Sequence, residues 1–300
     1  MTVDPRPASS PRFGLFLSQS NKPLSQVYDE FKMAEDLGFD HAWLVDHLVD
    51  TDGPPSHPIL EAWTLLAALA ARTSRIRLGV LVTSNTFRHP AVLLKAAVTV
   101  DHISGGRLIL GLGTGWHADE HRRYGLELLE PAERVDRFAE AVELISLLMA
   151  QERTTYAGRY YQLDDAPLEP RPLQTPRIPI LIAAHRPRML RLTARYADQW
   201  DTFAAMPDTA TDGVETELAE RIRYLDEACR SIGRDPAEIR RSTWATAAAL
   251  HSEDTYLDFV TRHRRLGFTD FSTVMPAPAD LPVLRHVAEH VIPEMRARRA

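Results

Sequence analysis

The fold is decided by residues 76–116, which open with Ile76-Arg77-Leu78-Gly79-Val80-Leu81-Val82 and close with Leu108-Ile109-Leu110-Gly111-Leu112-Gly113-Thr114-Gly115-Trp116. Both runs are too continuously apolar for strands with one exposed face, and they flank residues 91–103, whose apolar positions recur at helical spacing. This order predicts a buried parallel βαβ unit. Because parallel strands end at the same edge of a sheet, the polar and glycine-rich residues after each run should meet at a ligand-binding face.

The remaining chain alternates strand and helix at the spacing of a parallel sheet. Eight such units in about 290 residues predict an α/β fold, a (β/α)8 TIM barrel with an insertion between the fourth helix and the fifth strand. We expect a flexible tail over residues 1–12 and one barrel domain over residues 13–300. The insertion, at about residues 154–179, should contain a small hairpin. The other predicted strands are 13–17, 41–45, 180–183, 199–202, 239–247 and 270–274, and the predicted helices are 24–37, 59–72, 91–103, 131–150, 187–196, 214–232, 255–266 and 281–299.

Composition excludes several classes of partner. The formal net charge is -6, with 35 basic residues scattered among 41 acidic ones, so no positive field is expected to hold a nucleic acid. Cys229 is the only cysteine, which excludes a disulfide framework and a cysteine metal cluster. No apolar run reaches the length of a membrane span, and residues 1–12 lack an apolar signal segment. We therefore expect a cytoplasmic protein without membrane contact.

Polar residues follow two of the predicted strands. Asp46 and His47 come directly after the second strand, where a histidine can act as general acid or base; a loop histidine bonded to backbone is the alternative. Val82-Thr83-Ser84-Asn85 ends the third strand, and ligand contact and ordinary strand termination stay equally open there. Arg88 is more typical of a solvated or carboxylate-paired side chain than of a ligand.

Two further stretches suggest close backbone contact with a ligand. Residues 111–116 have the glycine density of a phosphate loop without its spacing, so they indicate approach to a flat ligand beside Trp116, or a tight barrel turn. Ala183-Ala184-His185-Arg186-Pro187 runs from a strand into a helix N-terminus, where Arg186 would complete an anion site. A surface role for Arg186 is the alternative.

A metal site is not predicted. His117 and His121 have the i, i+4 spacing of a ligand pair, and Glu120 lies beside them. No third ligand is visible, and the charged neighbours indicate a solvated face.

Together these stretches resemble the bacterial luciferase-like flavin and deazaflavin oxidoreductase family, most closely its actinobacterial branch that uses coenzyme F420. The likeness runs from about residue 13 to residue 233. The motifs that carry it are residues 76–79 through 87–90, Asp101-His102-Ile103-Ser104-Gly105-Gly106-Arg107, residues 111–116, Tyr156-Ala157-Gly158-Arg159-Tyr160-Tyr161 and Arg195-Tyr196-Ala197-Asp198.

The resemblance implies a barrel that is usually dimeric, with the isoalloxazine or deazaflavin ring in its mouth. Asp46 and His47 match the family's pair near the reactive edge of the ring, which implies that both are catalytic residues. Leu81 and Val82 match its non-prolyl cis peptide, and Thr83 matches a polar contact to the ring. The remaining cofactor positions are Gly113, Thr114, Gly115 and Trp116 beside the ring, and Ala183, Ala184, His185 and Arg186 in the phosphate loop.

Two departures from the family pattern limit what the resemblance implies. The sugar-phosphate dehydrogenase branch carries a catalytic glutamate at the position of Trp116, which weighs against that activity here. Many relatives have Gly-Gly or Ala-Gly where this chain has His185-Arg186, so the detailed phosphate geometry stays open.

Three functions are compatible with these residues. The first is an F420-dependent oxidoreductase that moves a hydride between the deazaflavin and a small organic substrate, with His47 giving or taking the proton and Trp116 helping to wall the pocket. The second is a reduced-FMN monooxygenase, and the third is a non-catalytic flavin-binding protein. A homodimer is expected from the resemblance alone. The loops expected to choose the substrate, residues 48–58, 118–130 and 206–213, carry no recognisable signature.

Overall fold

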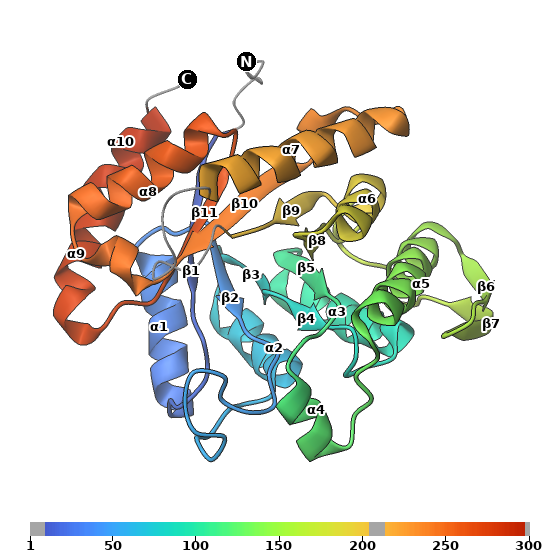
Figure 1. The fold of residues 1–300 in the computed structure, drawn as a ribbon. Coiled ribbons are helices and arrows are strands. Elements are labelled where there is room, and N and C mark those ends of the chain that lie inside the picture. The colour runs from blue at the N-terminus through green and yellow to red at the C-terminus, as the bar shows by residue number, and fades with distance from the viewer. Residues whose placement is uncertain (1–9, 204–213, 298–300) are drawn as a thin grey trace. The chain divides into compact units, whose positions relative to one another are not determined.

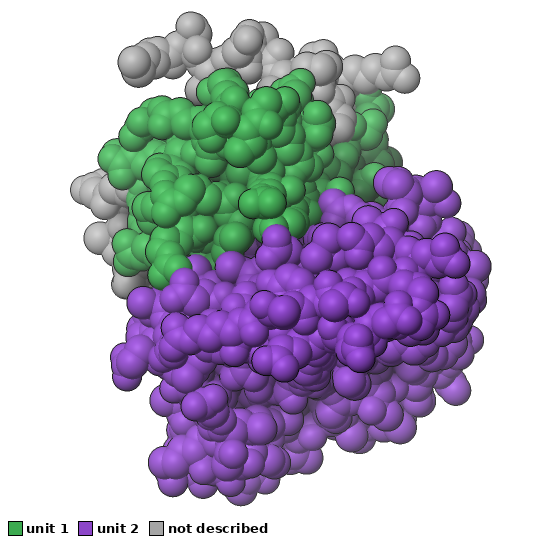
Figure 2. All heavy atoms as spheres, turned by 90° about the vertical axis from the view of Figure 1, so that its right-hand side faces the viewer, with its two compact units in different colours: residues 1–18, 29–43, 184–300 green, residues 19–28, 44–183 purple. Residues whose placement is uncertain are grey.

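The computed structural model describes residues 10–203 and 214–297, and the chain forms two compact units. Unit 1 comprises Met1–Ser18, Asp29–Trp43 and Ala184–Ala300, and unit 2 comprises Gln19–Tyr28 and Leu44–Ala183 (Figure 2). The expected substrate loop at residues 206–213 and most of the expected N-terminal tail lie outside the described residues. The division into a tail and one barrel domain stays a prediction.

Strands and helices alternate along the chain as predicted (Figure 1). No helix within the described ranges is long and apolar enough to cross a membrane. The elements are β1 (Arg12–Phe16), α1 (Leu24–Asp36), β2 (His41–Leu44), α2 (Ala62–Arg72), β3 (Arg77–Val80), β4 (Thr83–Ser84), α3 (Pro90–Ser104), β5 (Leu108–Gly113), α4 (Ala118–Tyr124), α5 (Pro131–Ala150), β6 (Arg153–Ala157), β7 (Gln162–Pro167), β8 (Ile180–Ala183), α6 (Pro187–Tyr196), β9 (Gln199–Asp201), α7 (Val214–Ser231), η1 (Pro236–Glu238), β10 (Arg240–Ala245), η2 (Ala247–Leu250), α8 (Glu253–Arg265), β11 (Asp270–Val274), η3 (Pro278–Asp280), α9 (Leu281–His286), η4 (Val287–Val291) and α10 (Ile292–Ala297).

Unit 1 contains parallel strands in the order β2, β1, β11, β10, β9. Phe13 and Phe271 are paired in register and stack with ring centroids 5.8 Å apart. Phe13 also lies 6.5 Å from the ring of Tyr256 on α8. On the opposite side of the sheet, the Nε2 of His41 lies 3.0 Å from the hydroxyl of Ser272. Because side chains alternate along a strand, the sheet has an apolar face toward the helices and a polar inner face.

Unit 2 contains the βαβ segment that the sequence predicts. Strands β3, β4 and β8 all pair with β5 in parallel, with Leu78 opposite Leu108 and Leu110 opposite Ile180. All six residues of β5 are buried, as expected for a strand covered on both faces. Helix α3 ends at Gly105, whose φ of 67° is the left-handed conformation that glycine adopts at low cost. The predicted βαβ unit is therefore confirmed.

The predicted hairpin is also present. Strands β6 and β7 form a separate antiparallel pair, and β6 contacts α5 (Figure 1). The carboxylate of Glu140 on α5 accepts hydrogen bonds from the successive amides of residues 159–161 at 2.8 to 3.3 Å. The carboxylate of Glu140 therefore holds the turn of the hairpin to α5.

Helix boundaries differ from the prediction in three places. Helix α2 begins after Glu61 and not at residue 59, because the Glu61 carboxylate caps it by accepting from the amides of residues 63 and 64. Residues 118–124, expected as a charged loop, form α4, which the side chain of His117 caps and Gly125 ends. The closing helix is interrupted by the π-helical η4, because Pro293 has no N–H to continue the α-helical pattern.

Candidate active site

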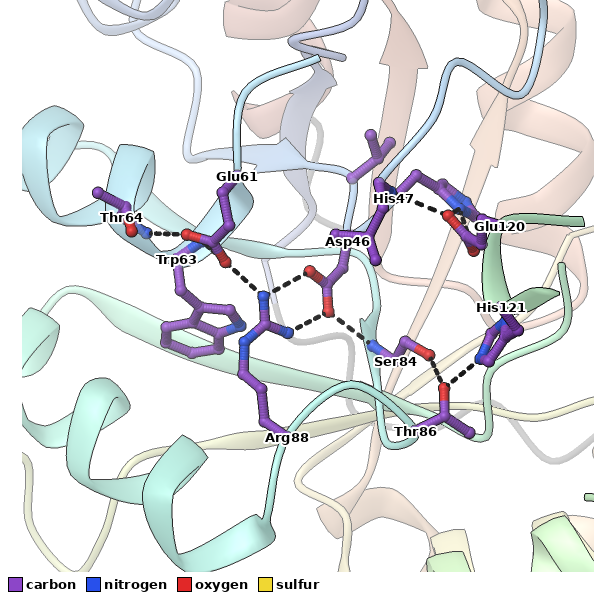
Figure 3. A network of polar contacts seen from close by, with 12 residues as sticks. Asp46, His47, Glu61, Trp63, Thr64, Ser84, Thr86, Arg88, Glu120 and His121 are labelled. Atoms are coloured by element: carbon purple, nitrogen blue, oxygen red, sulfur yellow. Dashed lines mark hydrogen bonds and ion pairs between the residues drawn. The ribbon is translucent and has the colours of Figure 1, made fainter. Parts of the chain in front are cut away.

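Asp46 is held in place by a buried ion pair. Its carboxylate accepts the Ser84 amide at 2.9 Å and two guanidinium nitrogens of Arg88 at 2.7 and 3.0 Å (Figure 3). Arg88 also contacts Glu61. Burial raises the pKa of Asp46, while the hydrogen bonds and charge of Arg88 act against that rise. The carboxylate-paired interpretation of Arg88 is therefore confirmed, and Asp46 joins the end of β2 to the segment after β4.

His47 is paired with a carboxylate of the segment that follows Trp116. Its Nδ1 lies 3.0 and 3.2 Å from the two carboxylate oxygens of Glu120 on α4. The Leu48 amide donates to the same carboxylate at 2.9 Å. Burial alone would raise the pKa of Glu120, but the hydrogen bonds from His47 and Leu48 hold it below its usual value. His47 is therefore not a loop histidine bonded to backbone.

A hydroxyl and imidazole chain anchors α4. The Nε2 of His121 lies 2.7 Å from the Thr86 hydroxyl, which lies 2.7 Å from the Ser84 hydroxyl (Figure 3). The Nδ1 of His121 lies 2.7 Å from the His117 carbonyl. A Cβ on Gly115, where φ is 79°, would come within 2.7 Å of both hydroxyls, so only glycine fits there.

The interpretation of this segment as a solvated face is wrong. Glu120 and His121 are each 1% exposed, because α4 turns both of them toward the protein. Within residues 10–203 and 214–297, no group of three or more histidine, cysteine or carboxylate side chains is arranged to hold a metal.

Trp116 lies beside His47. The two rings meet edge to face, with centroids 5.7 Å apart and an interplanar angle of 84°. Trp116 also contacts His117 at 4.9 Å, and it is 64% exposed. A large exposed aromatic side chain next to a candidate proton donor is available to cover a small ligand.

The break between β3 and β4 contains the non-prolyl cis peptide that the resemblance implies. The Leu81–Val82 peptide is cis. Thr83 is fully buried, and its hydroxyl has no hydrogen-bond partner in the described part of the chain. A Cβ on Gly113 would lie 2.5 Å from Val82, so the close packing of the two strands requires glycine.

The polar groups of Thr114 and Gly115, the two residues after Gly113, make contacts within the protein. The Thr114 hydroxyl lies 3.3 Å from the Gly115 carbonyl, which also accepts from Arg134 at 2.6 Å. Both residues are half-buried. The roles of residues 113–116 beside a cofactor stay predictions.

The predicted phosphate loop belongs to unit 1 apart from Ala183, which ends β8. The Ala184 amide donates to the Asp201 carbonyl at 3.0 Å. The Nδ1 of His185 lies 3.0 Å from the Thr202 hydroxyl, which also accepts from Arg221 on α7 at 3.0 Å. Burial, reinforced by the charge of Arg221, lowers the pKa of His185 to about 4. His185 is therefore neutral at physiological pH.

Arg186 leaves the phosphate-loop prediction open. It is exposed and precedes the N-terminus of α6, where its side chain makes no capping hydrogen bond. A helix N-terminus with a guanidinium beside it suits an anion. Both the anion role and the surface role are compatible with this position.

A buried carboxyl group at the end of β9 was not anticipated. Asp201 is 4% exposed and accepts a hydrogen bond from the Ser242 hydroxyl at 2.7 Å. Burial raises its pKa to about 7, against the opposing effect of the Ser242 hydrogen bond. The acidic residue in the short strand Gln199–Asp201 gave no signal of this burial.

Comparison with known proteins gives the family. Residues 9–287 match the luciferase-like monooxygenase family. The chain belongs to this family. The predicted membership is therefore confirmed.

Three known proteins illustrate the range of relatives. The chain is 37% identical to an F420-dependent glucose-6-phosphate dehydrogenase of Microbacterium testaceum, over 94% of this chain and 83% of that one. It is 34% identical to pyrimidine monooxygenase RutA of Allorhizobium ampelinum, over 76% of this chain and 59% of the relative. A solved F420-dependent secondary alcohol dehydrogenase, in complex with an F420-acetone adduct, has a TM-score of 0.81 at 19% identity, over 94% of this chain and 98% of that one. The predicted luciferase-like (β/α)8 barrel is confirmed.

Proposed function

We propose that the protein is an F420-dependent oxidoreductase that transfers a hydride between the deazaflavin and an organic substrate, and that His47 gives or takes the accompanying proton. The relatives confirm the predicted oxidoreductase class and F420 as its cofactor. The single observation that supports the role of His47 is its setting. It follows β2 with a side chain 17% exposed, and it lies against an aromatic ring and a carboxylate.

In each unit, taken separately, there are residues that fit part of such a cofactor. The Thr83 hydroxyl is buried without a partner in the described residues, which suits the polar ring contact that the resemblance implies. Arg186 at the N-terminus of α6 suits a phosphate. When bound, F420 supplies the hydride chemistry. We propose that His47 handles the proton and that Asp46, through Arg88, keeps the end of β2 in position.

The decisive test is a titration of the purified apoprotein with oxidised F420 and with FMN at one salt concentration, followed by fluorescence. We expect micromolar or tighter binding of F420 and much weaker binding of FMN. A preference for FMN would favour the monooxygenase alternative, which the 34% identity to RutA supports. Binding of neither would contradict the proposal and favour a non-catalytic protein.

We would identify the class of substrate by measuring turnover with chemically distinct candidate substrates. Trp116 weighs against a sugar phosphate, whereas the 37% identity to a glucose-6-phosphate dehydrogenase keeps that substrate in the test. We would compare glucose 6-phosphate and propan-2-ol with F420, and cyclohex-2-en-1-one with reduced F420. Turnover is read from the absorbance change of the cofactor.

We also propose that the protein is a homodimer and acts in the cytoplasm. Family membership supports the dimer. Light scattering after size exclusion would test the first statement, and cell fractionation the second. A monomer at micromolar concentration would contradict the dimer.

A further inference from the structure

We infer that Glu120 orients His47 for proton transfer: it fixes the imidazole tautomer with the proton on Nδ1 and leaves Nε2 to exchange a proton with the substrate. The inference rests on the proposed function. Glu120 was considered above only as a possible metal ligand. In the present inference it is a positioning residue that acts through His47.

The protonation state of Glu120 decides the tautomer. Its pKa lies below the usual value, because the hydrogen bonds from His47 and the Leu48 amide outweigh the effect of burial. An ionised carboxylate can only accept hydrogen bonds. Since both of its oxygens lie within 3.2 Å of His47 Nδ1, that nitrogen must carry the hydrogen.

The other ring nitrogen is left for chemistry. Nε2 of His47 has no hydrogen-bond partner in the ranges that the structure describes, and in this tautomer it carries the lone pair. With an alcohol as substrate, bound F420 would supply the acceptor for the hydride of the carbinol C–H bond, and Nε2 would take the proton of the O–H bond, so that a carbonyl forms. In the reverse direction, Nε2–H returns the proton to the developing alkoxide. The fixed negative charge of Glu120 stabilises the imidazolium in both directions.

Glu120 itself cannot reach a substrate. It is 1% exposed, and its two oxygens are taken by His47 and by the Leu48 amide. It acts only through the ring that it holds.

The helix that carries Glu120 is also held through the next residue, His121. The His117 carbonyl can only accept, so His121 donates to it from Nδ1 and accepts the Thr86 hydroxyl at Nε2. The Thr86 oxygen is then free to accept from the Ser84 hydroxyl. This one-way chain ties α4 to the segment 84–86 and limits the movement of Glu120.

The test is Glu120→Gln, with Asp119→Asn as the matched control. Both changes remove one negative charge from α4, but Asp119 is 37% exposed and faces Arg122 and Arg123. The glutamine amide can donate to Nδ1 and thereby favour the other tautomer. Nitrogen-15 NMR of histidine-labelled protein reports the tautomer, and the His47 signals, among twelve histidines, are assigned by their loss in His47→Gln.

We expect wild type and Asp119→Asn to carry the proton on Nδ1, and Glu120→Gln to lose this state. With the substrate that wild type turns over in the screen, Glu120→Gln should lower kcat by about 100-fold or more, while F420 affinity stays within about threefold, well under the tenfold that 1.4 kcal/mol represents. Glu120→Asp, which keeps the charge, should recover part of kcat and the Nδ1–H signal.

Wild-type His47 protonated on Nε2, or Glu120→Gln with wild-type kcat, would overturn the inference. If Glu120→Gln does not fold, the wild-type tautomer still decides. The NMR measurement needs neither cofactor nor substrate, so a protein that fails to bind F420 would contradict the proposed function and leave the tautomer result standing.

Discussion

The structure places two histidines just after parallel strands and gives them opposite surroundings. His47 follows β2 and lies against the Glu120 carboxylate. His185 follows β8 and shares the Thr202 hydroxyl with Arg221. Burial and the arginine lower the pKa of His185 to about 4. A carboxylate neighbour can accept the hydrogen of an imidazole and stabilise its charge, whereas burial of the ring, with a cation nearby, favours the neutral form.

The sequence around the two histidines does not distinguish them, because the residue that determines the surroundings of each ring lies far away along the chain. Glu120 lies 73 positions after His47. Arg221, on α7, lies 36 positions after His185 and contacts the Thr202 hydroxyl that His185 also contacts. Both residues follow a strand, a position that gives access to a ligand. The difference between them comes from the helices, because α4 brings a carboxylate to His47 and α7 brings a guanidinium close to His185.

The largest effect that tests this contrast is expected for His47→Gln. Loss of the proton carrier should lower kcat by about 100- to 10,000-fold, the usual contribution of a general acid or base. F420 affinity should change little, because cofactor binding does not need the imidazole. Stopped-flow absorbance of the cofactor measures the first quantity, and the fluorescence titration measures the second.

The matched replacement is His185→Gln. It should affect the dissociation constant of F420 and not the turnover number at saturation. A fall of kcat in His185→Gln as large as that in His47→Gln would break the contrast between the two residues.

A smaller effect is expected from the buried carboxyl of Asp201, on the pH dependence of stability. Its pKa is about 7 in the folded protein and near 3.8 in the unfolded chain. Between these values the folded state binds the extra proton, so its contribution is present at low pH and is lost as pH rises toward 7. Relative to Asp201→Asn, wild type should therefore lose up to about 4 kcal/mol from pH 4 to pH 7.

Urea unfolding at several pH values measures this difference. The asparagine keeps the acceptor for the Ser242 hydroxyl, so the packing is matched. Glu220→Gln, which changes an exposed carboxylate on α7, is the control and should give a flat difference. A constant offset between Asp201→Asn and wild type across this range would mean that Asp201 is ionised in the folded protein.

The fold was predictable because its signals are local. The apolar run of β5, the helical spacing before it and the glycine at residue 105 each indicate an element without reference to distant residues. The hairpin at residues 153–167 was indicated by its aromatic residues around a glycine. The cis peptide between Leu81 and Val82 came from family resemblance, since no local rule predicts one.

The candidate site was predictable only in part. Strand-end position singled out Asp46 and His47, but the burial of Glu120 was missed because α4 is seven residues long and rich in charge. Its one usable signal was the glycine at residue 125, which is typical of a helix end and indicates a short helix, but does not indicate which of its side chains are buried. The partner of His185 could not be predicted, because Arg221 is one of many charged residues on an amphipathic helix.

The smallest effect concerns His185→Gln and has the opposite sign to that of Asp201→Asn. The unfolded chain takes up a proton near pH 6.5, whereas the folded protein resists it until about pH 4. The contribution of His185 is therefore present above pH 6.5 and lost as pH falls. Wild type should lose about 2 to 3 kcal/mol relative to the variant between pH 7 and pH 4.5. His251→Gln, at a histidine 63% exposed, should show no such slope. If wild type instead gained stability on acidification, the folded protein would bind a proton at His185 more readily than the unfolded chain does, and the neutral form inferred for His185 would be wrong.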